Sequence, residues 1–352
     1  MRTSAPDRPE VAVIIGAFRR REFLRQAVRS VLAQTLPRDR FEVVVLKDFL
    51  DDELDGALAA DGVTTIQDTE PRIGRWLLRA FRATTAPLIA LLDDDDEWEP
   101  DRLARAVAVL HEHPEVGLYR NRVRVIDRHG APVPADRWRR LESDLAFDVS
   151  GPVRIPPGPK AGLVEFASVR TRVTFNSSTM VVRRELLEGA WGEAFATTQL
   201  PDLTLFLVAA LGPSGLYFDD RRLTRFRRYD GNVTLRSGWL AEASRSYREG
   251  ADLARAHHRA DFENWLRAAA AQYGRQFRAS ELFESIAANG SRAHVARLTA
   301  AYLGFSVRHP TGRGGIGDVG ATGIYGLAYC LAPGMTRRAR AARTPAVEPR
   351  AS

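Results

Sequence analysis

The sequence predicts an α/β fold in which helices flank a mostly parallel, doubly wound sheet, followed by a helical C-terminal extension. Two observations in the first third of the chain indicate the sheet. Short, wholly apolar runs alternate with amphipathic segments, and one of these runs leads directly into four consecutive aspartates at positions 93–96. A third observation, a continuous helical pattern from about residue 239 to residue 305, indicates the extension.

Four apolar runs have the length and composition of buried parallel strands: residues 11–15, 41–46, 63–66 and 87–92. Helices are predicted over residues 23–32, where the apolar face ends before Pro37, and over residues 74–82. Pro100 suits the first turn of a further helix, because the amide that proline lacks has no partner there. This alternation of strands and helices favours a parallel sheet.

The next part of the chain is predicted to complete the sheet. We expect a hairpin or strand pair over residues 116–126, a turn at 127–130, a proline-rich connection over 131–160, a strand over 178–182, a helix from Pro201 and two strands near 215–228. We therefore divide the chain into an α/β part over residues 1–235 (halves about 9–125 and 126–235), a helical region over 236–310 and a glycine-rich, basic tail over 311–352.

Composition limits the function classes. The 352 residues carry 51 lysines and arginines against 44 aspartates and glutamates, a net charge of +7, and Lys47 and Lys160 are the only lysines. The arginine excess has two interpretations, the codon usage of a GC-rich genome or a surface that binds anions. A nucleic-acid-binding protein is the disfavoured alternative. The sequence has no basic stripe interleaved with aromatic residues, and consecutive aspartates repel phosphate unless a metal binds them.

Cysteine and hydropathy patterns add three expectations. Cys330 is the only cysteine, so an intramolecular disulfide and a cysteine-based zinc cluster are excluded. The first ten residues are polar and the first apolar run is short, so we expect no signal peptide and no membrane span. The expected location is the cytoplasm, with the inner face of the membrane as the alternative site.

The four aspartates at 93–96 are the strongest chemical signal. Like charges at this spacing raise one another's pKa unless a cation neutralises them. Ligands of open α/β sheets bind beyond the carboxyl ends of the strands, and carboxylate oxygens suit Mg²⁺ or Mn²⁺. The alternative is a solvated turn before a helix N-terminus, where acidic residues are favourable without any ligand. We interpret the cluster as a metal or nucleotide site.

These residues resemble a known family. The segment Leu92-Asp-Asp-Asp-Asp-Glu-Trp98, followed by Pro100-Asp-Arg-Leu103, is similar to the LDxDDxWxPDxL segment of family 2 glycosyltransferases with the GT-A fold. The apolar run at 11–15, with Arg19-Arg20 and the SVLAQT sequence at 30–35, resembles the first strand and helix of that family. The resemblance covers about residues 9–235. Lys47-Asp48-Phe49 and the extra aspartate resemble a subset seen among archaeal and thermophilic members.

The resemblance implies an inverting, metal-dependent transfer of a sugar from a nucleotide-diphosphate-sugar donor (UDP-, GDP- or dTDP-linked) to an acceptor hydroxyl. It implies that Asp93 contacts the ribose of the donor, that Asp95 binds a Mg²⁺ or Mn²⁺ ion that bridges the phosphates, and that Asp93 and Asp96 support this ion. Asp48 matches the aspartate that recognises the base. The backbone of Gly16, Ala17 and Phe18 would complete the nucleotide pocket.

The acceptor side is matched by later segments. The Leu200-Pro201-Asp202 element resembles the family's glutamate–aspartate pair that opens a helix, which makes Asp202 the candidate general base; a plain first-turn aspartate is the alternative. Asn176 and Ser177 resemble residues beside the acceptor. Tyr229 stands where the family often has a histidine, which leaves Arg227 and Arg228 as the expected diphosphate contacts. The sequence Tyr119-Arg120-Asn121 resembles a subset signature to which we assign no chemistry.

Two functional alternatives and one region stay open. A nucleotide-sugar-binding pseudo-enzyme is compatible with the proline in place of the glutamate and with Tyr229. A nucleotidyltransferase is disfavoured, because no glycine-rich, basic loop follows the first strand. The acceptor is a glycan, a lipid-linked molecule or a small molecule, and its specificity is expected in loops such as 131–175. The C-terminal region is either a peripheral contact with anionic lipid or a packing appendage.

Overall fold

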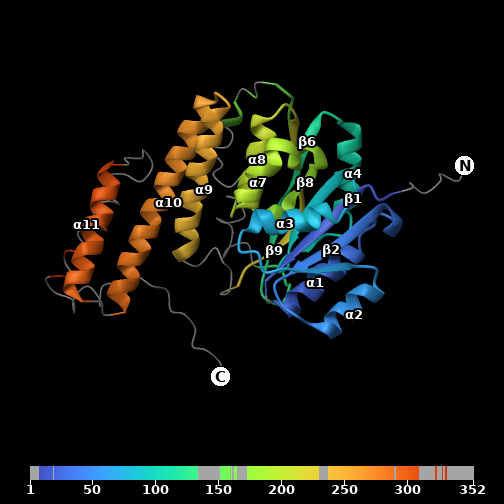
Figure 1. The fold of residues 1–352 in the computed structure, drawn as a ribbon, viewed down its shortest axis with the longest axis horizontal. Helices are drawn as coiled ribbons and strands as arrows, with labels where there is room; N and C mark the ends of the chain where they lie inside the picture. The colour runs from blue at the N-terminus through green and yellow to red at the C-terminus, as the bar shows by residue number, and fades with distance from the viewer. Residues whose placement is uncertain are drawn as a thin grey trace, which may run out of the picture. The chain divides into compact units, whose positions relative to one another are not determined.

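The computed structural model describes residues 8–18, 20–133, 151–158, 160, 162–164, 173–229, 237–288 and 291–308, together with residues 322, 327 and 330. The chain divides into two compact units (Figure 1), the first comprising Met1–Asp230 and Ala254–Asp261 and the second Gly231–Leu253 and Phe262–Ser352. Most of the predicted 131–160 connection and nearly all of the 311–352 tail lie outside the described residues.

The first unit begins with four parallel strands, β1 (Val11–Ala17), β2 (Phe41–Lys47), β3 (Thr64–Gln67) and β4 (Leu88–Asp93), which lie in the order β3-β2-β1-β4. Ala17 pairs with Lys47 and Gly16 pairs with Asp93, so the carboxyl ends of three strands meet at one edge. The helices of this part are α1 (Arg21–Leu32), α2 (Asp52–Ala60), α3 (Ile73–Arg82) and α4 (Arg102–Glu112), with a short 3₁₀ helix, η1 (Arg38–Arg40).

The sheet continues beyond β4 with mixed polarity. β8 (Met180–Arg183) runs antiparallel to β4 and to β6 (Val116–Ile126), and β9 (Gly215–Arg227) runs parallel to β6. Two short strands, β5 (Glu97–Trp98) and β7 (Val153–Ile155), pair antiparallel with β9. The remaining elements of this part are η2 (Ser177–Thr179), η3 (Arg184–Leu187), α7 (Gly189–Thr197) and α8 (Pro201–Leu211).

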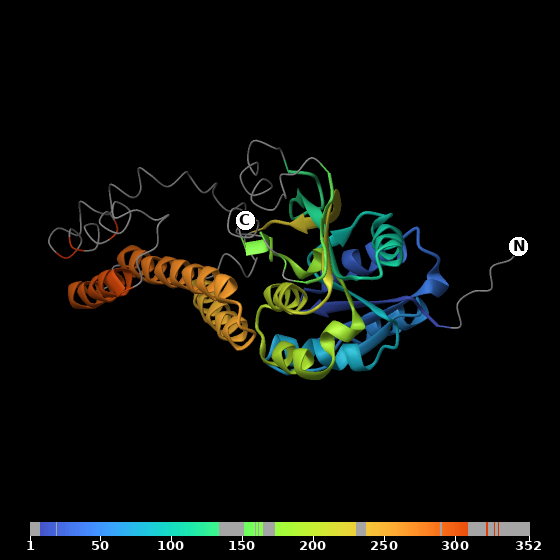
Figure 2. The ribbon, with the colours of Figure 1, turned by 90° about the horizontal axis from the view of Figure 1, so that it is seen from above.

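Helices cover both faces of the sheet (Figure 2). Every residue of β1 is therefore buried, and neither face of that strand meets water. The side chains of Val11, Val13 and Ile15 belong to one apolar cluster with residues of α1 and α4. The opposite face of β1 is covered by α3, whose Trp76 lies against Gly16. The predicted α/β fold with flanking helices is confirmed.

A close approach joins α3 to α7 and to the segment that follows it. A Cβ atom at Gly74 would lie 1.8 Å from the carbonyl oxygen of Phe195, so only glycine fits there. The amide of Gly74 donates to the carbonyl of Thr198 (3.0 Å), and the amide of Ile73 donates to Oε1 of Gln199 (3.3 Å). The first turn of α3 therefore gains acceptors for amides that have none within the helix.

The structure corrects several predicted elements. Residues 116–126 form one strand, β6, and not a hairpin or strand pair; the predicted turn at 127–130 follows it. Residues 215–227 also form one strand, because register shifts near Asn121 absorb the polar break in the middle of β9. The helix α2 was not predicted. Its sequence buries only Leu54 and Leu58, and its start depends on Asp51, whose carboxylate accepts the amide of Leu54 (3.1 Å).

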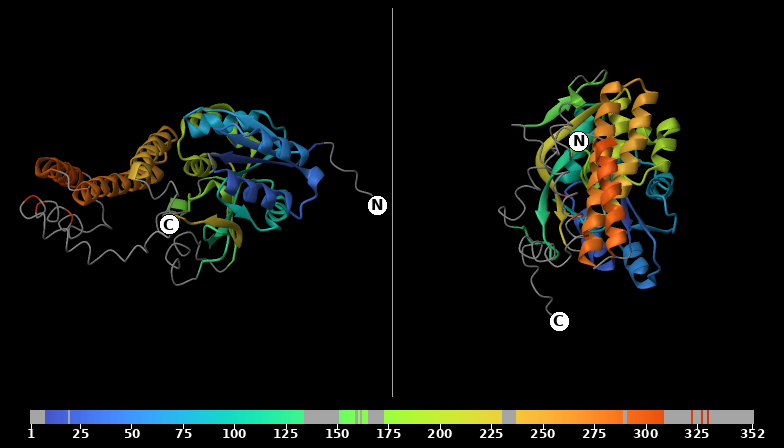
Figure 3. Two further views of the ribbon diagram at one scale, coloured as in Figure 1. Left: turned by 90° about the horizontal axis from the view of Figure 1, so that it is seen from below. Right: turned by 90° about the vertical axis from the view of Figure 1, so that its left-hand side faces the viewer.

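The second unit contains most of three long helices, α9 (Ser237–Ala256), α10 (Ala260–Ala287) and α11 (Arg292–Arg308), which lie side by side (Figure 3). Gly274 of α10 is the point of closest approach, since a Cβ atom there would lie 2.7 Å from the ring of Phe305 and 3.1 Å from Oγ of Ser244. The predicted helical extension is confirmed. Among the described helices, none is both long and apolar enough to cross a bilayer.

Candidate active site

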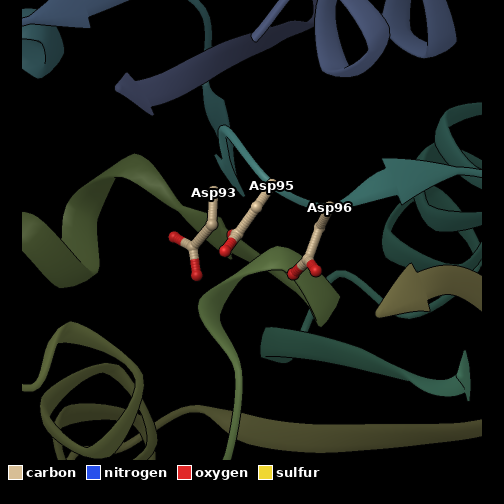
Figure 4. Close-up of side chains that lie close together, drawn as sticks. All are labelled: Asp93, Asp95 and Asp96. Atoms are coloured by element: carbon tan, nitrogen blue, oxygen red, sulfur yellow. The ribbon is translucent and has the colours of Figure 1, made fainter. Parts of the chain in front are cut away.

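The candidate site is a turn at the carboxyl edge of β1, β2 and β4. The amide of Asp94 donates to the carbonyl of Gly16 (3.1 Å), and the amide of Asp96 donates to the carbonyl of Asp93 (3.1 Å). This turn directs three carboxylates to one place (Figure 4), where ligand oxygens of Asp93, Asp95 and Asp96 all lie within 4.8 Å of one another. The structure thus brings together the three predicted metal ligands.

Hydrogen bonds hold two of these carboxylates in position. Oδ1 of Asp93 accepts the hydroxyl of Ser177 (3.1 Å). Oδ2 of Asp96 accepts the side-chain amide of Asn176 (2.8 Å), and its Oδ1 accepts the backbone amide of Arg227 (3.0 Å). The predicted acceptor-side residues Asn176 and Ser177 therefore contact the carboxylate cluster itself.

Burial governs the electrostatics of the cluster. Burial, reinforced by the charge of Asp95, raises the pKa of Asp93 to about 7 and the pKa of Asp96 well above its usual range. Several buried carboxylates this close require a cation to ionise together. Three hard oxygen donors on a tight turn match the ligand preference of Mg²⁺ and Mn²⁺, so the residues present fit a divalent ion.

Asp94, the fourth aspartate, has a different environment. It is fully buried, its Oδ2 accepts the amide of Phe18 (3.0 Å), and its Oδ1 is ion-paired with Arg20. Burial raises the pKa of Asp94 to about 8, against the opposing effect of Arg20. Asp94 therefore fixes the segment after β1, and it does not belong to the group of three carboxylates.

Arg20 is a site residue that sequence reasoning missed. Its guanidinium is ion-paired with Asp94 and with Oδ2 of Asp95, and its Nη1 also donates to the hydroxyl of Tyr229 (3.1 Å). The Tyr229 hydroxyl in turn donates to Asp95 (3.2 Å). The available signal was the Arg19-Arg20 pair, which directly follows the first strand at the edge where the aspartates gather.

Asp202 lies at the start of α8 as predicted. Its Oδ2 accepts the backbone amide of Asn176 (2.9 Å), its Oδ1 accepts the amide of Leu203 (2.8 Å), and burial raises its pKa. Asn176 adopts φ +75°, which turns its amide toward Asp202 while its side chain donates to Asp96. One residue thus joins the candidate base to the carboxylate cluster.

The predicted nucleotide side lies along the ends of β1 and β2. Phe18 is 40% exposed, and the centroid of its ring lies 4.5 Å from that of Trp76. A Cβ atom at Gly16 would lie 2.9 Å from the Trp76 ring, so the glycine lets the tryptophan approach the strand. Asp48 is half-buried and its amide donates to the carbonyl of Ala17 (3.3 Å). Gly16, Ala17, Phe18 and Asp48 are therefore neighbours at the strand ends.

Arg227 and Arg228 differ in environment. Arg227 is fully buried: its Nε donates to the carbonyl of Asp95 (2.8 Å), its Nη1 donates to the carbonyl of Arg128 (2.7 Å), and its Nη2 is paired with Glu97. Arg228 is half-buried, and its amide donates to the carbonyl of Ile126 (2.8 Å). Arg227 thus anchors the aspartate turn, and a role for either arginine at the diphosphate stays a prediction.

The fold and the site define a class of protein. A carboxylate turn at the edge of an open α/β sheet, with a buried aspartate at the start of a nearby helix, is the arrangement expected of a GT-A glycosyltransferase. Residues 12–181 match the family described as glycosyl transferase family 2. Residues 12–181, just under half of the chain, are therefore similar to family 2 glycosyltransferases.

Individual relatives are distant. The chain is 28% identical over 150 residues to an uncharacterized glycosyltransferase from Nostoc, a match that covers 39% of this chain and 44% of that protein. The chain thus spans less than half the length of this relative. It also covers 53% of a solved structure of TarS from S. aureus.

Two solved structures show the fold over nearly the whole chain. TarS 1-349 from S. aureus, in complex with UDP, has a TM-score of 0.55 at 13% identity, with 96% of this chain and 94% of that chain covered. The mannosyltransferase PcManGT from Pyrobaculum calidifontis, in complex with GDP-Man and Mn²⁺, has a TM-score of 0.51 at 18% identity, with 93% and 88% covered. At these identities the similarity establishes the fold.

Proposed function

We propose that this protein is an inverting, metal-dependent glycosyltransferase that moves a sugar from a nucleotide-diphosphate sugar to an acceptor hydroxyl. One observation carries the proposal: Asn176 donates its side-chain amide to Asp96 and its backbone amide to Asp202, which couples a metal-binding carboxylate to a candidate base. Both groups are needed on opposite sides of the reacting carbon, one beside the leaving group and one beside the nucleophile.

The proposed donor side consists of the strand-end residues and the carboxylate turn. Asp93, Asp95 and Asp96 would hold Mg²⁺ or Mn²⁺, which when bound supplies positive charge to the diphosphate leaving group. Gly16, Ala17, Phe18 and Asp48 would receive the nucleoside. TarS structures contain UDP and UDP-GlcNAc, and the PcManGT structure contains GDP-Man, so UDP- and GDP-sugars are the first donors to test.

The proposed base is Asp202. Burial raises its pKa, which suits a carboxylate that must take a proton from an acceptor hydroxyl as the bond to the sugar forms. The two backbone amides that donate to Asp202 fix its orientation. Ser177, whose hydroxyl donates to Asp93, would lie between the base and the donor ribose.

A screen of nucleotide sugars tests this proposal. UDP-, GDP- and dTDP-sugars are added with Mn²⁺ or Mg²⁺, and thermal shift and donor hydrolysis are measured. Asp95→Ala is expected to lose metal-dependent donor binding and hydrolysis, whereas Asp101→Ala, an exposed aspartate of the same region, is expected to behave as the parent. Equal donor and metal binding by Asp95→Ala and the parent would contradict the site assignment.

The alternative function, a pseudo-enzyme that binds nucleotide sugar without turnover, rests on the ion pair between Arg20 and Asp95 and on Tyr229 in place of a histidine. The same screen separates the two. A pseudo-enzyme gives a thermal shift with one donor but neither hydrolysis nor transfer to any hydroxyl acceptor.

We propose a glycan, a lipid-linked molecule or a small glycoside as the acceptor, with the full chain contacting anionic lipid peripherally through its C-terminal region. Arginine residues attract anionic headgroups, and the attraction falls with ionic strength. Co-sedimentation of the full chain with anionic vesicles at low salt, and its absence with zwitterionic vesicles, is the expected result. Equal recovery of the protein with anionic and with zwitterionic vesicles would contradict the proposed electrostatic contact.

A further inference from the structure

We propose that Arg20 is a resident counter-ion of the carboxylate turn, which exchanges Asp95 for the diphosphate when metal and nucleotide bind. The inference rests on the proposed function and extends it. Arg20 would make the binding of metal and the binding of nucleotide cooperative, because each ligand removes an obstacle to the other.

Geometry is the first support. Arg20 lies between β1 and α1, its side chain is 22% exposed, and its guanidinium bridges Asp94 and Asp95. Asp95 belongs to the proposed metal ligands, whereas Asp94 does not. The guanidinium therefore pairs at one end with Asp95, a proposed metal ligand, and at the other end with Asp94, a buried carboxylate outside the proposed ligand set.

Charge is the second support. A divalent ion on Asp95 would lie beside the positive charge of Arg20, and two cations on one carboxylate repel each other strongly where water is scarce. Arg20 must then leave Asp95 or weaken the binding of the ion. Its pair with Asp94 would keep the guanidinium close to the site during this change.

Unused hydrogen-bonding capacity is the third support. Nη1 of Arg20 donates to Asp95 and to the hydroxyl of Tyr229, and Nη2 is paired with Asp94. Nε is buried and has no acceptor in the part of the chain that the structure describes. A guanidinium released from Asp95 would regain partners from the oxygens of a diphosphate, for which its planar set of donors is suited.

The experiment measures Mn²⁺ binding to the full chain from the electron paramagnetic resonance signal of free Mn²⁺, first without nucleotide and then with saturating UDP or GDP. For Arg20→Gln we expect Mn²⁺ alone to bind more tightly than to the parent, by on the order of tenfold, because a competing cation is gone. We also expect the added nucleotide to improve Mn²⁺ binding less than in the parent, by about the same factor.

Two variants control the result. Arg25→Gln removes an equal charge from an exposed position on α1, where the guanidinium is paired with the exposed Glu53 (3.9 Å), and is expected to bind Mn²⁺ as the parent does. Arg20→Lys keeps the charge with a single donor group and is expected to lie between the parent and Arg20→Gln. It also reports on Arg20 if the glutamine variant fails to fold.

The outcomes are distinct. Equal Mn²⁺ affinities in the parent, Arg20→Gln and Arg20→Lys would overturn the counter-ion role while leaving the proposed function intact. Weaker Mn²⁺ binding in Arg20→Gln would overturn it as well, since Arg20 would then support the site and not compete with the ion. Failure of the parent to bind Mn²⁺ with either nucleotide would contradict the proposed function and this inference together.

Discussion

The first unit buries a carboxylate cluster at the end of β4 and two arginines in and beside the mixed half of its sheet. In the parallel half, strands β1–β4 with the turn at 93–96, the buried charges at the site are carboxylates. In the mixed half, strands β6, β8 and β9 with the adjacent helix α4, they include Arg120 of β6 and Arg102 of α4, and burial lowers the pKa of each arginine to about 9. The two halves meet where β8 pairs with β4.

The buried arginines and the buried carboxylates also differ in the groups that they contact. Arg102 lies 3.8 Å from the ring centroid of Trp98 and donates to Asn121 (3.1 Å). Arg120 donates to the carbonyl of Phe175 (2.8 Å) and to the hydroxyl of Thr179 (3.2 Å). These contacts are with neutral groups, and the charge of Asp202 also acts on Arg120, whereas the three clustered carboxylates fit a divalent cation. We therefore expect the parallel half to exchange ligands and the mixed half to hold the acceptor-side segment in place.

Arg120 has a structural role in the segment that carries Asn176 and Ser177. The sequence Tyr119-Arg120-Asn121 had no chemistry from sequence alone, but Arg120 holds the two ends of the segment that carries Asn176 and Ser177. We infer that Arg120 is a positioning residue for the acceptor side.

The largest expected effect concerns Asp202, the one carboxylate proposed to act on the acceptor. Asp202→Asn removes the proton acceptor, so we expect transfer to fall by roughly 10²–10⁴-fold with unchanged donor affinity. Product formation and nucleotide binding are measured on the same sample. Asp101→Asn serves as the control, and undiminished transfer by Asp202→Asn would exclude it from the mechanism.

A change between pH 6 and pH 8 tests the acidic character of the parallel half. The pKa values of Asp93 and Asp94, about 7 and about 8, lie above those of the unfolded chain, so the metal-free fold favours protonated carboxylates and loses stability as pH rises through this window. A divalent ion binds the ionised forms. We expect Mn²⁺ affinity to rise by roughly tenfold between pH 6 and pH 8 while the melting temperature of the metal-free protein falls. A pH-independent affinity would contradict the electrostatic account.

Substitution of Arg120 tests the rigidity of the mixed half. Arg120→Met leaves the carbonyl of Phe175 and the hydroxyl of Thr179 without this donor, which we expect to lower the free energy of unfolding by about 2 kcal/mol. Urea denaturation measures the loss. Transfer should fall more than Mn²⁺ and donor binding, and Arg120→Lys should recover part of the transfer activity. A fall in Mn²⁺ affinity equal to the fall in transfer would contradict separate roles for the two halves, because Arg120 would then affect the carboxylate turn as much as the acceptor side.

The smallest effect is expected at Lys47, a buried cation of the parallel half that is not at the carboxylate turn. Its Nζ donates to the carbonyl of Phe49 (2.7 Å) and pairs with the partly exposed Asp55 (3.0 Å). Lys47→Met should reduce the free energy of unfolding by about 1 kcal/mol, because water already screens Asp55. Mn²⁺ affinity should be unchanged in a titration. A change in affinity as large as that expected for Arg20→Gln would indicate that any nearby cation affects the ion, and would contradict a specific role for Arg20.

The sequence was sufficient to predict the four parallel strands, the carboxylate turn and the place of Asp202 at the start of a helix, because strand ends and helix starts are local signals. It was not sufficient for Arg20, nor for the contacts that Asn176 makes with Asp96 and Asp202. The contacts of Arg20 join residues 75 positions apart, and those of Asn176 depend on a positive φ that its neighbours impose. Nor does the sequence separate Arg227 from Arg228. Successive strand residues point to opposite sides, and only the packed sheet shows which of them is enclosed.

Gly74 has a consequence for attempts to recombine such enzymes. The helix α3 precedes β4 in the chain, yet its first turn is capped by Thr198 and Gln199, three to four positions before Asp202. A chimera with its crossover just after β4 would take α3 from one parent and the Phe195 backbone, against which Gly74 packs, from the other. Such a hybrid should inherit residues 73–82 from the same parent as residues 195–202, even though the two stretches fall on opposite sides of the junction.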